Sequence, residues 1–170
     1  QRSEVLERVK ELADRKATIS QNDLPYIIDD VLARPHDCHF VLDSVMIVSS
    51  CGLRSTATVK LTYTSPETSV TATYEETAQG DGGYDAFMNT IRNIASKIDI
   101  ALPQLVDYGI TIPPGGHSDA IVQCTITWRK GDRTLMTKGV NSDQVLAAAE
   151  ATEKMLNLWL MSIDSEVVNG

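Results

Sequence analysis

The feature that most constrains the fold is an order of segments that occurs twice along the chain. Three stretches with a two-residue hydrophobic period precede one stretch with a helical period, first over residues 39–98 and again over 102–163. A period of two is typical of a strand with one buried face, and a period near 3.6 is typical of an amphipathic helix. The sequence therefore predicts two strand–strand–strand–helix modules with internal pseudo-symmetry.

In the first module the predicted strands are residues 39–49, 54–64 and 69–76. The third of them is expected to place Val70, Ala72 and Tyr74 on one face. A glycine-rich segment then opens a helix that runs to about Ile98. The predicted buried stripe of this helix consists of Phe87, Ile91, Ile94 and Ile98.

In the second module residues 102–112 are predicted to be extended, 120–127 alternate as a strand, and 133–138 return after a hairpin turn at Gly131-Asp132. The closing helix is expected to begin at Ser142, which we predict to be its N-cap, with Asp143 favourably placed in the first turn.

Residues 1–36 are predicted to form a helical linker subdomain, and residues 37–170 a second domain. A helix over residues 3–16, capped by Ser3, precedes a capping-box pattern at Ser20 and Asp23. The second helix is expected to turn four apolar side chains inward: Leu24, Ile27, Ile28 and Val31. The predicted fold class is α+β, with two pseudo-symmetric βββα modules packed as a sandwich after this two-helix subdomain.

Charge and cysteine content exclude several kinds of partner and site. The net charge is −8 and no basic stripe is present, which argues against nucleic acid and anionic membranes as partners. Cys38, Cys51 and Cys124 are odd in number and far apart, which favours a reducing cytoplasm over a disulfide framework. The cluster from His36 to His39 matches no standard zinc spacing, so we predict a turn after Pro35 and no metal site.

No catalytic motif is apparent in the sequence, and we predict that this chain by itself is catalytically inactive. Gly80-Asp81-Gly82-Gly83 follows a predicted strand and opens a helix, so its backbone N–H groups could bind an anion. A simple strand-to-helix turn with glycine at positive φ explains the same residues. The polar segment 115–119 is either a surface loop or a functional loop. These residues alone leave the alternatives open.

Several segments together resemble the regulatory domain of α-isopropylmalate and citramalate synthases. The segment from Gly80 to Ala86 resembles the family signature Gly-Asp-Gly-Pro-Val-Asp-Ala, and the resemblance runs from about residue 5 to 160. Gly83 replaces the usual proline of the signature, and Tyr84 replaces a common aliphatic residue. The other similar segments are 10–16 with Asp23-Leu24, Leu105 to Tyr108, Gly116 to Ala120, Lys138 to Asp143, and Glu153 to Asn157.

The resemblance implies a function for the chain. Parent enzymes of this family condense acetyl-CoA with a 2-oxo acid on a TIM-barrel domain that uses a divalent metal. Their regulatory domain binds the end product, leucine or isoleucine, near a homodimer interface. Carried over by position, the family's ligand contacts would be Tyr84, Asp85, Leu105, Tyr108, Ile112, Val122, Ser142 and Gln144.

The chemistry of a free amino acid is compatible with these residues. Its carboxylate could lie at the helix N-terminus near Gly82, and its ammonium could pair with Asp85. Leu105 and Tyr108 could equally be plain core residues.

The resemblance leaves more than one function open. The leading hypothesis is a leucine-binding regulatory domain of 2-isopropylmalate synthase that mediates feedback inhibition. An isoleucine-binding domain of citramalate synthase is the alternative, because the two ligands differ only in branching. A dimerisation module without a ligand and a small metabolic enzyme are further alternatives.

Overall fold

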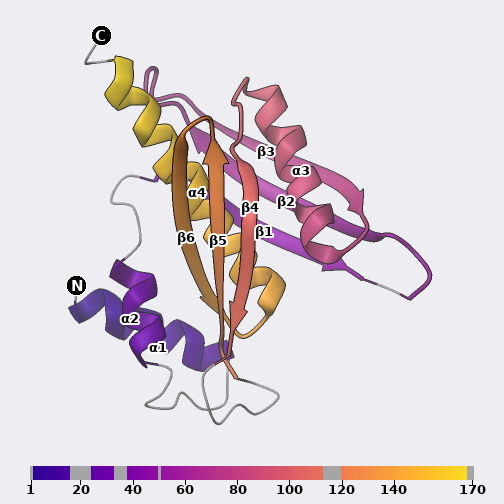
Figure 1. The fold of residues 1–170 in the computed structure, drawn as a ribbon, viewed down its shortest axis with the longest axis vertical. Helices are drawn as coiled ribbons and strands as arrows, with labels where there is room; N and C mark the ends of the chain where they lie inside the picture. Colours follow the sequence, from indigo (N-terminus) through magenta and orange to yellow (C-terminus); the bar gives the residue numbers. More distant parts are fainter. Residues whose placement is uncertain (1, 16–23, 33–37, 50, 113–119, 168–170) are drawn as a thin grey trace. The chain divides into compact units, whose positions relative to one another are not determined.

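The structure is a computed structural model of the 170-residue chain. It describes residues 2–15, 24–32, 38–49, 51–112 and 120–167 (Figure 1). The fold is α+β, with two three-stranded antiparallel sheets that are each followed by a helix, as predicted. In chain order the elements are α1 (Arg2–Arg15), α2 (Leu24–Leu32), β1 (Phe40–Val48), β2 (Ser55–Thr64), β3 (Thr71–Gly80), α3 (Gly83–Lys97), β4 (Gln104–Thr111), β5 (Val122–Lys130), β6 (Arg133–Asn141) and α4 (Gln144–Val167).

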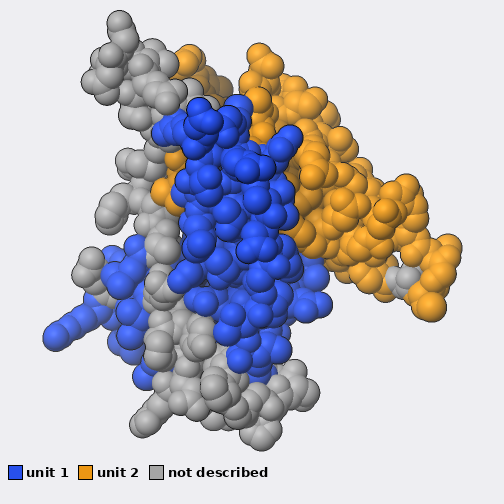
Figure 2. Space-filling view, in the orientation of Figure 1, with its two compact units in different colours: residues 1–35, 104–155 blue, residues 36–103, 156–170 orange. Residues whose placement is uncertain are grey.

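The chain divides into two compact units that are interleaved in sequence (Figure 2). Unit 1 comprises residues 1–35 and 104–155, and unit 2 comprises residues 36–103 and 156–170. Helix α4 therefore contributes its first half to unit 1 and its second half to unit 2. Each unit contains one of the two sheets.

In unit 2 the sheet has the order β1-β2-β3, and α3 packs against β2 and β3 (Figure 1). The inward face of β2 carries Ala57, Val59 and Leu61, all of which are buried. The opposite face is polar, and threonine hydroxyls pair across the strands. This division into one apolar and one polar face follows from the alternation that predicted the strand.

The second half of α4 closes one end of this unit through Asn157, which is buried. Its side-chain Oδ1 accepts hydrogen bonds from the backbone N–H groups of His39 at 2.7 Å and Phe40 at 2.9 Å. Its Nδ2 donates to the Phe40 carbonyl oxygen at 2.9 Å. These bonds satisfy backbone groups where β1 begins, which would otherwise be costly to bury.

In unit 1 the sheet has the order β4-β5-β6, and α4 packs on it at Gly139. A Cβ atom at Gly139 would lie 2.0 Å from the backbone oxygen of Ala147, so only glycine permits this approach. The face of β5 on that side is fully apolar and buried: Val122, Cys124, Ile126 and Trp128. Helices α1 and α2 bury Leu12 and Ile27 in a cluster with Ile121 and Val140.

The structure corrects some details of the sequence prediction. β3 begins at Thr71, so Val70 lies in the preceding turn, where it is exposed, and does not share a strand face with Ala72 and Tyr74. A turn with positive φ at Ser69 reverses the chain there. In α2, Ile27 and Val31 are buried as predicted, but Leu24 and Ile28 are exposed.

Of the N-caps predicted for the first two helices, one is wrong and the other cannot be compared with the structure. α1 begins at Arg2, so Ser3 lies inside the helix and is not its N-cap. The predicted capping box at Ser20 and Asp23 lies outside the described residues.

Candidate functional site

The start of α3 carries three of the predicted effector residues: Gly82, Tyr84 and Asp85. Gly82 is the N-cap residue, has an extended backbone and makes no side-chain capping hydrogen bond. Asp85 is exposed, and its Oδ2 accepts a hydrogen bond from the backbone N–H of Asp81 at 3.0 Å. The Tyr84 ring stacks on Phe87 with a centroid distance of 5.9 Å. The helix therefore begins with an exposed carboxylate beside a first turn that has no side-chain N-cap.

Close packing fixes the position of this helix start. A Cβ atom at Gly80, the last residue of β3, would lie 2.2 Å from the backbone nitrogen of Ala86. At Gly82 an added Cβ would meet nothing within 4 Å. Gly80 is thus needed for contact between strand and helix, whereas the space beside Gly82 is open. Neither Gly80 nor Gly82 is among the residues with positive φ, so the turn interpretation based on left-handed glycine does not apply to them.

Four further predicted residues lie in or next to β4 and β5 of unit 1: Leu105, Tyr108, Ile112 and Val122. Leu105 is opposite Trp128 and Tyr108 is opposite Ile126, so both lie on the face that packs against α4. Ile112 follows β4 directly. Val122 is buried, whereas Leu105, Tyr108 and Ile112 are 39%, 36% and 56% exposed. β4 is an edge strand, and its apolar side chains are only half covered.

Tyr108 interacts with Cys124, which is fully buried on the neighbouring strand. Its hydroxyl group donates a hydrogen bond to the Cys124 sulfur atom. Burial raises the pKa of the Cys124 thiol to about 11, although this hydrogen bond opposes the shift. Burial, together with the negative charge that Cys124 would carry, also raises the pKa of Tyr108. Both groups are therefore protonated at neutral pH, and the tyrosine is positioned as a neutral side chain.

The remaining predicted residues, Ser142 and Gln144, flank Asp143 between β6 and α4. Asp143, and not the predicted Ser142, caps α4: its Oδ1 accepts hydrogen bonds from the backbone N–H groups of Val145 at 2.8 Å and Leu146 at 3.0 Å. The backbone N–H of Asp143 in turn donates to Asn141 Oδ1 at 3.1 Å. These bonds fix the backbone on both sides of Ser142.

The nine predicted effector residues thus fall into two groups, one in each unit. Gly82, Tyr84 and Asp85 are adjacent in unit 2. In unit 1, Leu105, Tyr108 and Val122 share a sheet face, and the β-bridge between Val122 and Asn141 brings the start of β5 beside the residue that precedes Ser142. The predicted set is therefore two local clusters on separate elements.

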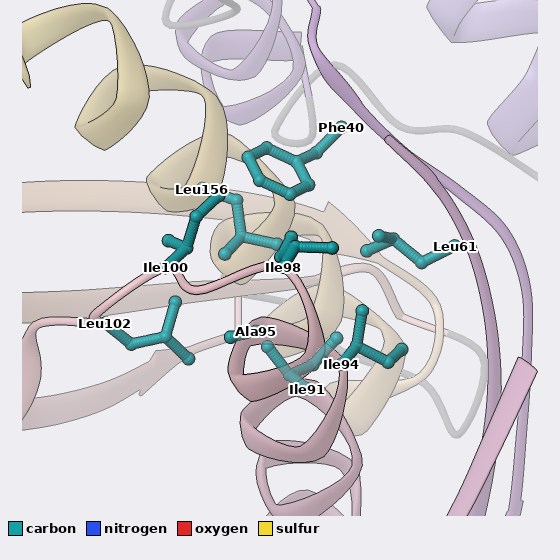
Figure 3. A pocket seen from close by; sticks show the side chains of 9 residues that line it. All are labelled: Phe40, Leu61, Ile91, Ile94, Ala95, Ile98, Ile100, Leu102 and Leu156. Carbon is teal, nitrogen blue, oxygen red and sulfur yellow. The ribbon is translucent and has the colours of Figure 1, made fainter. Parts of the chain in front are cut away.

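A separate pocket in unit 2 is lined by apolar side chains alone (Figure 3). Side chains from β1, β2, α3, the segment after α3, and α4 converge on it: Phe40, Leu61, Ile91, Ile94, Ala95, Ile98, Ile100, Leu102 and Leu156. Such a lining can accept an alkyl group. It offers no side-chain partner for a carboxylate or an ammonium group, so it does not match a whole amino acid.

A buried group of charged side chains in unit 1 was not predicted from the sequence. Arg8, Asp30 and Lys154 are 5%, 0% and 6% exposed. Arg8 pairs with Asp30 at 3.1 Å and also with Glu150, and Lys154 pairs with Asp30 at 2.6 Å. Asp30 lies three residues after Ile27 on the buried side of α2, and that charged residue on an apolar stripe was the available signal.

This group also bonds to the backbone of β6. Arg8 Nη2 donates to the carbonyl oxygen of Val140 at 2.8 Å, and Lys154 Nζ donates to that of Lys138 at 2.7 Å. Burial raises the pKa of Glu150, although Arg8 and a hydrogen bond from Asn141 oppose the shift. The two cations therefore connect α1 and α4 to the same strand.

Two other predicted features can be compared with the described residues. Within the described ranges, no group of three or more His, Cys, Asp or Glu side chains could hold a metal ion. His36 and Asp37 lie outside those ranges, as does the whole polar segment 115–119. No helix in the described part of the chain is long and apolar enough to span a membrane.

Known proteins provide an independent comparison. An (R)-citramalate synthase, CimA, from Methanocaldococcus jannaschii is 31% identical over 161 residues, which cover 94% of this chain and 31% of that protein. A 2-isopropylmalate synthase from Methylorubrum populi is 29% identical over 154 residues, covering 91% of this chain and 27% of that protein. The 2-isopropylmalate synthase of Ruminiclostridium cellulolyticum is 29% identical over 162 residues. The chain spans about a third of the length of these curated relatives.

A family model agrees with these relatives and matches most of the chain. The matched region, residues 18–160, includes α2, both sheets, α3 and most of α4. It contains all nine predicted effector residues, and its description names both regulation and dimerisation. The chain therefore belongs to the LeuA allosteric (dimerisation) domain family.

Proposed function

We propose that the chain is the regulatory part of a 2-isopropylmalate synthase, in which it binds leucine as a feedback inhibitor at a homodimer interface. The observation that carries the proposal is the start of α3. The family match concerns an allosteric domain. The segment that resembles the family signature forms this helix start, where the N-cap residue Gly82 has no capping side chain and Asp85 is exposed. The nine effector residues are proposed as ligand contacts, three of them in unit 2 and six in unit 1.

The helix start suits the charged end of an amino acid. The first N–H groups of a helix point toward its N-terminus and favour an anion there. The α-carboxylate of the ligand can therefore bind beside Gly82, where space is open. The carboxylate of Asp85 can then pair with the ligand ammonium group in a charge-assisted hydrogen bond. Because Asp85 already accepts a hydrogen bond from Asp81, its position is defined before the ligand binds.

The half-covered face of β4 suits the branched side chain of the ligand. Leu105, Tyr108 and Ile112 expose apolar surface there, and Val122 lies on the neighbouring strand. The hydroxyl group of Tyr108 interacts with Cys124, and we propose that the Tyr108 ring contacts the alkyl group of the ligand. Covering these side chains with an alkyl group stabilises the complex by about 25 cal/mol for each Å² buried. Ser142 and Gln144 supply polar groups at the β6–α4 turn.

Isoleucine is the second candidate effector, in a parent that makes citramalate. The similarity to the citramalate synthase of Methanocaldococcus jannaschii favours it. Leucine and isoleucine have the same volume, and a pocket separates such ligands by about 1–3 kcal/mol. The difference depends on the position of one methyl group against Leu105, Ile112 and Val122.

A melting scan with millimolar leucine, isoleucine and valine tests the sensor. At a hundredfold excess over Kd, the ligand that binds the native state stabilises it by about 2.7 kcal/mol. Asp85→Ala should remove most of the ligand-induced shift, because the bound ammonium loses its partner, at a cost of about 2–5 kcal/mol. Val122→Ala is the milder control and should weaken binding by about 0.8 kcal/mol for each methyl group lost. If no branched-chain amino acid shifts the wild-type melting temperature, a dimerisation module without a ligand is the better account.

A homodimer is also part of the proposal. Helices α1 and α2 expose apolar side chains that the described part of the chain leaves uncovered: Leu6, Leu24, Ile28 and Leu32. The family description includes dimerisation, and a two-fold symmetric dimer is the commonest assembly. Light scattering at tens of micromolar should give twice the monomer mass of 18.6 kDa. A monomer mass would contradict this part of the proposal.

The catalytic function is proposed for the parent protein and not for this chain. The relatives are about three times longer, and a (β/α)₈ barrel needs about 250 residues. We propose that the parent is a cytoplasmic acyltransferase whose catalytic barrel lies in the same polypeptide and uses a divalent metal. Residues 1–36 remain the proposed linker subdomain and 37–170 the proposed effector domain. Condensation of acetyl-CoA with 2-oxoisovalerate or pyruvate by the purified chain would contradict its proposed inactivity.

A further inference from the structure

The buried charges of unit 1 continue into a chain of side-chain contacts that ends at the β6–α4 turn. Arg8 of α1 pairs with Glu150 Oε2 on α4. The other carboxylate oxygen of Glu150, Oε1, accepts a hydrogen bond from Asn141 Nδ2 at 2.8 Å. Asn141 Oδ1 accepts from the backbone N–H of Asp143 at 3.1 Å. Glu150 and Asn141 thus each use one polar atom on the side of α1 and another on the side of the turn.

We propose that Arg8, Glu150 and Asn141 form a relay that couples the position of α1 to the backbone around Ser142 and Gln144. The inference rests on the proposed function, because Ser142 and Gln144 matter only if they contact the effector. In this account the three side chains are positioning residues and do not touch the ligand. Effector binding that shifts the turn is felt at α1, and by reciprocity the docking of α1 changes effector affinity.

Burial is what makes such a relay effective. Arg8 and Asn141 are 5% and 2% exposed, and the Glu150 side chain between them is 24% exposed, so water has little access to the two ends of the series. A buried charge or amide that loses its partner is costly, so the side chains prefer to move together. A displacement of Asn141 is therefore passed on to Glu150 and Arg8. An exposed set of the same residues would absorb the displacement by exchanging partners with solvent.

The other half of the charged group provides a matched control. Asp30 pairs with Arg8 and Lys154, and Lys154 also donates to the carbonyl oxygen of Lys138. Asp30→Asn removes a buried charge that Arg8 also contacts, but it changes none of the three side chains of the Arg8–Glu150–Asn141 series. Glu150→Gln keeps the side-chain shape and places an amide group against Arg8. Asn141→Ala cuts the series from its other end without changing the net charge.

The experiment measures hydrogen exchange of the full 170-residue chain with and without saturating leucine, and then with isoleucine. In the wild type, we expect the ligand to slow exchange of the α1 amides about fivefold or more. In Asn141→Ala and in Glu150→Gln this slowing should disappear, and the Kd for the amino acid should rise by a similar factor. In Asp30→Asn, exchange in α2 should be faster without ligand, but α1 should still respond to it.

The outcomes separate the relay from the sensor. If leucine or isoleucine binds and α1 exchange does not change, the relay is wrong and the sensor stands. If α1 responds equally in wild type and Asn141→Ala, coupling does not pass through these side chains, and the relay is again wrong. If Glu150→Gln fails to fold, Asn141→Ala decides alone. If neither amino acid binds, the proposed function fails and the relay fails with it.

Discussion

The two modules share a topology, but the helices that follow their third strands begin differently. In unit 1, Asp143 caps α4 by accepting hydrogen bonds from two backbone N–H groups. In unit 2, the N-cap residue of α3 is Gly82, which has no capping side chain. A capped helix start has its donors occupied, whereas an uncapped start can offer them to a ligand. A repeated fold can thus keep one helix start capped and leave its counterpart open to an anion.

Both modules have a glycine where the third strand approaches the following helix most closely. Gly80 lies against the start of α3, and Gly139 lies against α4. Both contacts involve backbone atoms of the helix, which cannot rotate away as a side chain can. The close approach is therefore a shared requirement of the modules, and the helix cap is the variable part.

The largest expected effect comes from breaking this shared contact. Gly139→Ala and Gly80→Ala would place a Cβ atom 2.0 Å and 2.2 Å from helix backbone atoms. We expect each to lower the free energy of unfolding by about 3 kcal/mol or more in denaturant titration. Gly82→Ala is the control, since an added Cβ meets nothing within 4 Å, and should change stability by less than about 0.5 kcal/mol. Equal losses at all three positions would contradict the close packing.

The next effect concerns the central strand of unit 1, where Cys124 is buried. Its pKa is raised from 9.0 to about 11 in the folded chain, so the native state binds more protons than the unfolded state between these values. The free energy of unfolding should therefore fall as pH rises from about 9 to 11, by up to about 2–3 kcal/mol from this group. Cys124→Ala should remove that part of the pH dependence.

The three cysteines should differ in their reactivity toward an alkylating reagent. Cys38 and Cys51 are exposed, so alkylation of the native chain at pH 8 should modify them and spare Cys124. Rapid alkylation of all three thiols would contradict the burial of β5.

A smaller effect is expected at the caps. Asp143→Ala removes the N-cap of α4 and should cost about 1 kcal/mol. Asp85→Ala removes an exposed hydrogen bond and a favourable charge at α3, and should cost only a few tenths of a kcal/mol without ligand. The two variants can be compared by urea titration. A larger loss at Asp85 would reverse the assignment of closed and open helix starts.

The smallest effect on stability, but a decisive one for function, is expected from Gly82→Asp. The extended backbone of Gly82 can accept an N-cap side chain, so the variant should gain a few tenths of a kcal/mol. Its carboxylate would take the donors that we assign to the ligand and would repel the ligand carboxylate. The melting shift with leucine or isoleucine should therefore shrink, whereas Gly82→Ala should retain it. A full shift in Gly82→Asp would place the ligand carboxylate elsewhere.

Local patterns were enough to predict most elements. The stripe Phe87, Ile91 and Ile94 predicted α3, and all three side chains are 0–2% exposed. The alternation of Ala57, Val59 and Leu61 predicted β2 and its buried face. These signals succeed because the faces of a helix or strand are set by neighbours a few residues apart.

The sequence predictions were wrong where a helix or strand boundary depended on more than the periodic pattern of neighbouring residues. Ser142 and Asp143 are both good N-cap residues, and sequence could not choose between them. The choice falls on Asp143 because β6 extends to Asn141, whose side chain accepts the Asp143 N–H. Val70 was misplaced because the turn at Ser69 has a positive φ that no preference of serine predicts.

The buried charged group could not be predicted because its members are far apart in the sequence. Arg8 and Glu150 are 142 positions apart in the chain, and Arg8 bonds to a carbonyl oxygen 132 positions away. A helical pattern identifies Arg8 only as one charged residue among several in α1. The effector residues were predicted from the family resemblance. The N-cap at Asp143 and the hydrogen bond from Tyr108 to Cys124 became known only from the structure.

The interleaving of the two units has a consequence for the chain as it is synthesised. Asn157 bonds to the backbone of His39 and Phe40, which leave the ribosome 118 and 117 residues earlier. At about 5–20 residues per second, the start of β1 waits roughly 6 to 24 s for its partner. During that interval the apolar side of the first sheet can be covered by α3 but not by α4. We therefore expect nascent chains that stop before residue 156 to need a chaperone, however completely the first module has been translated.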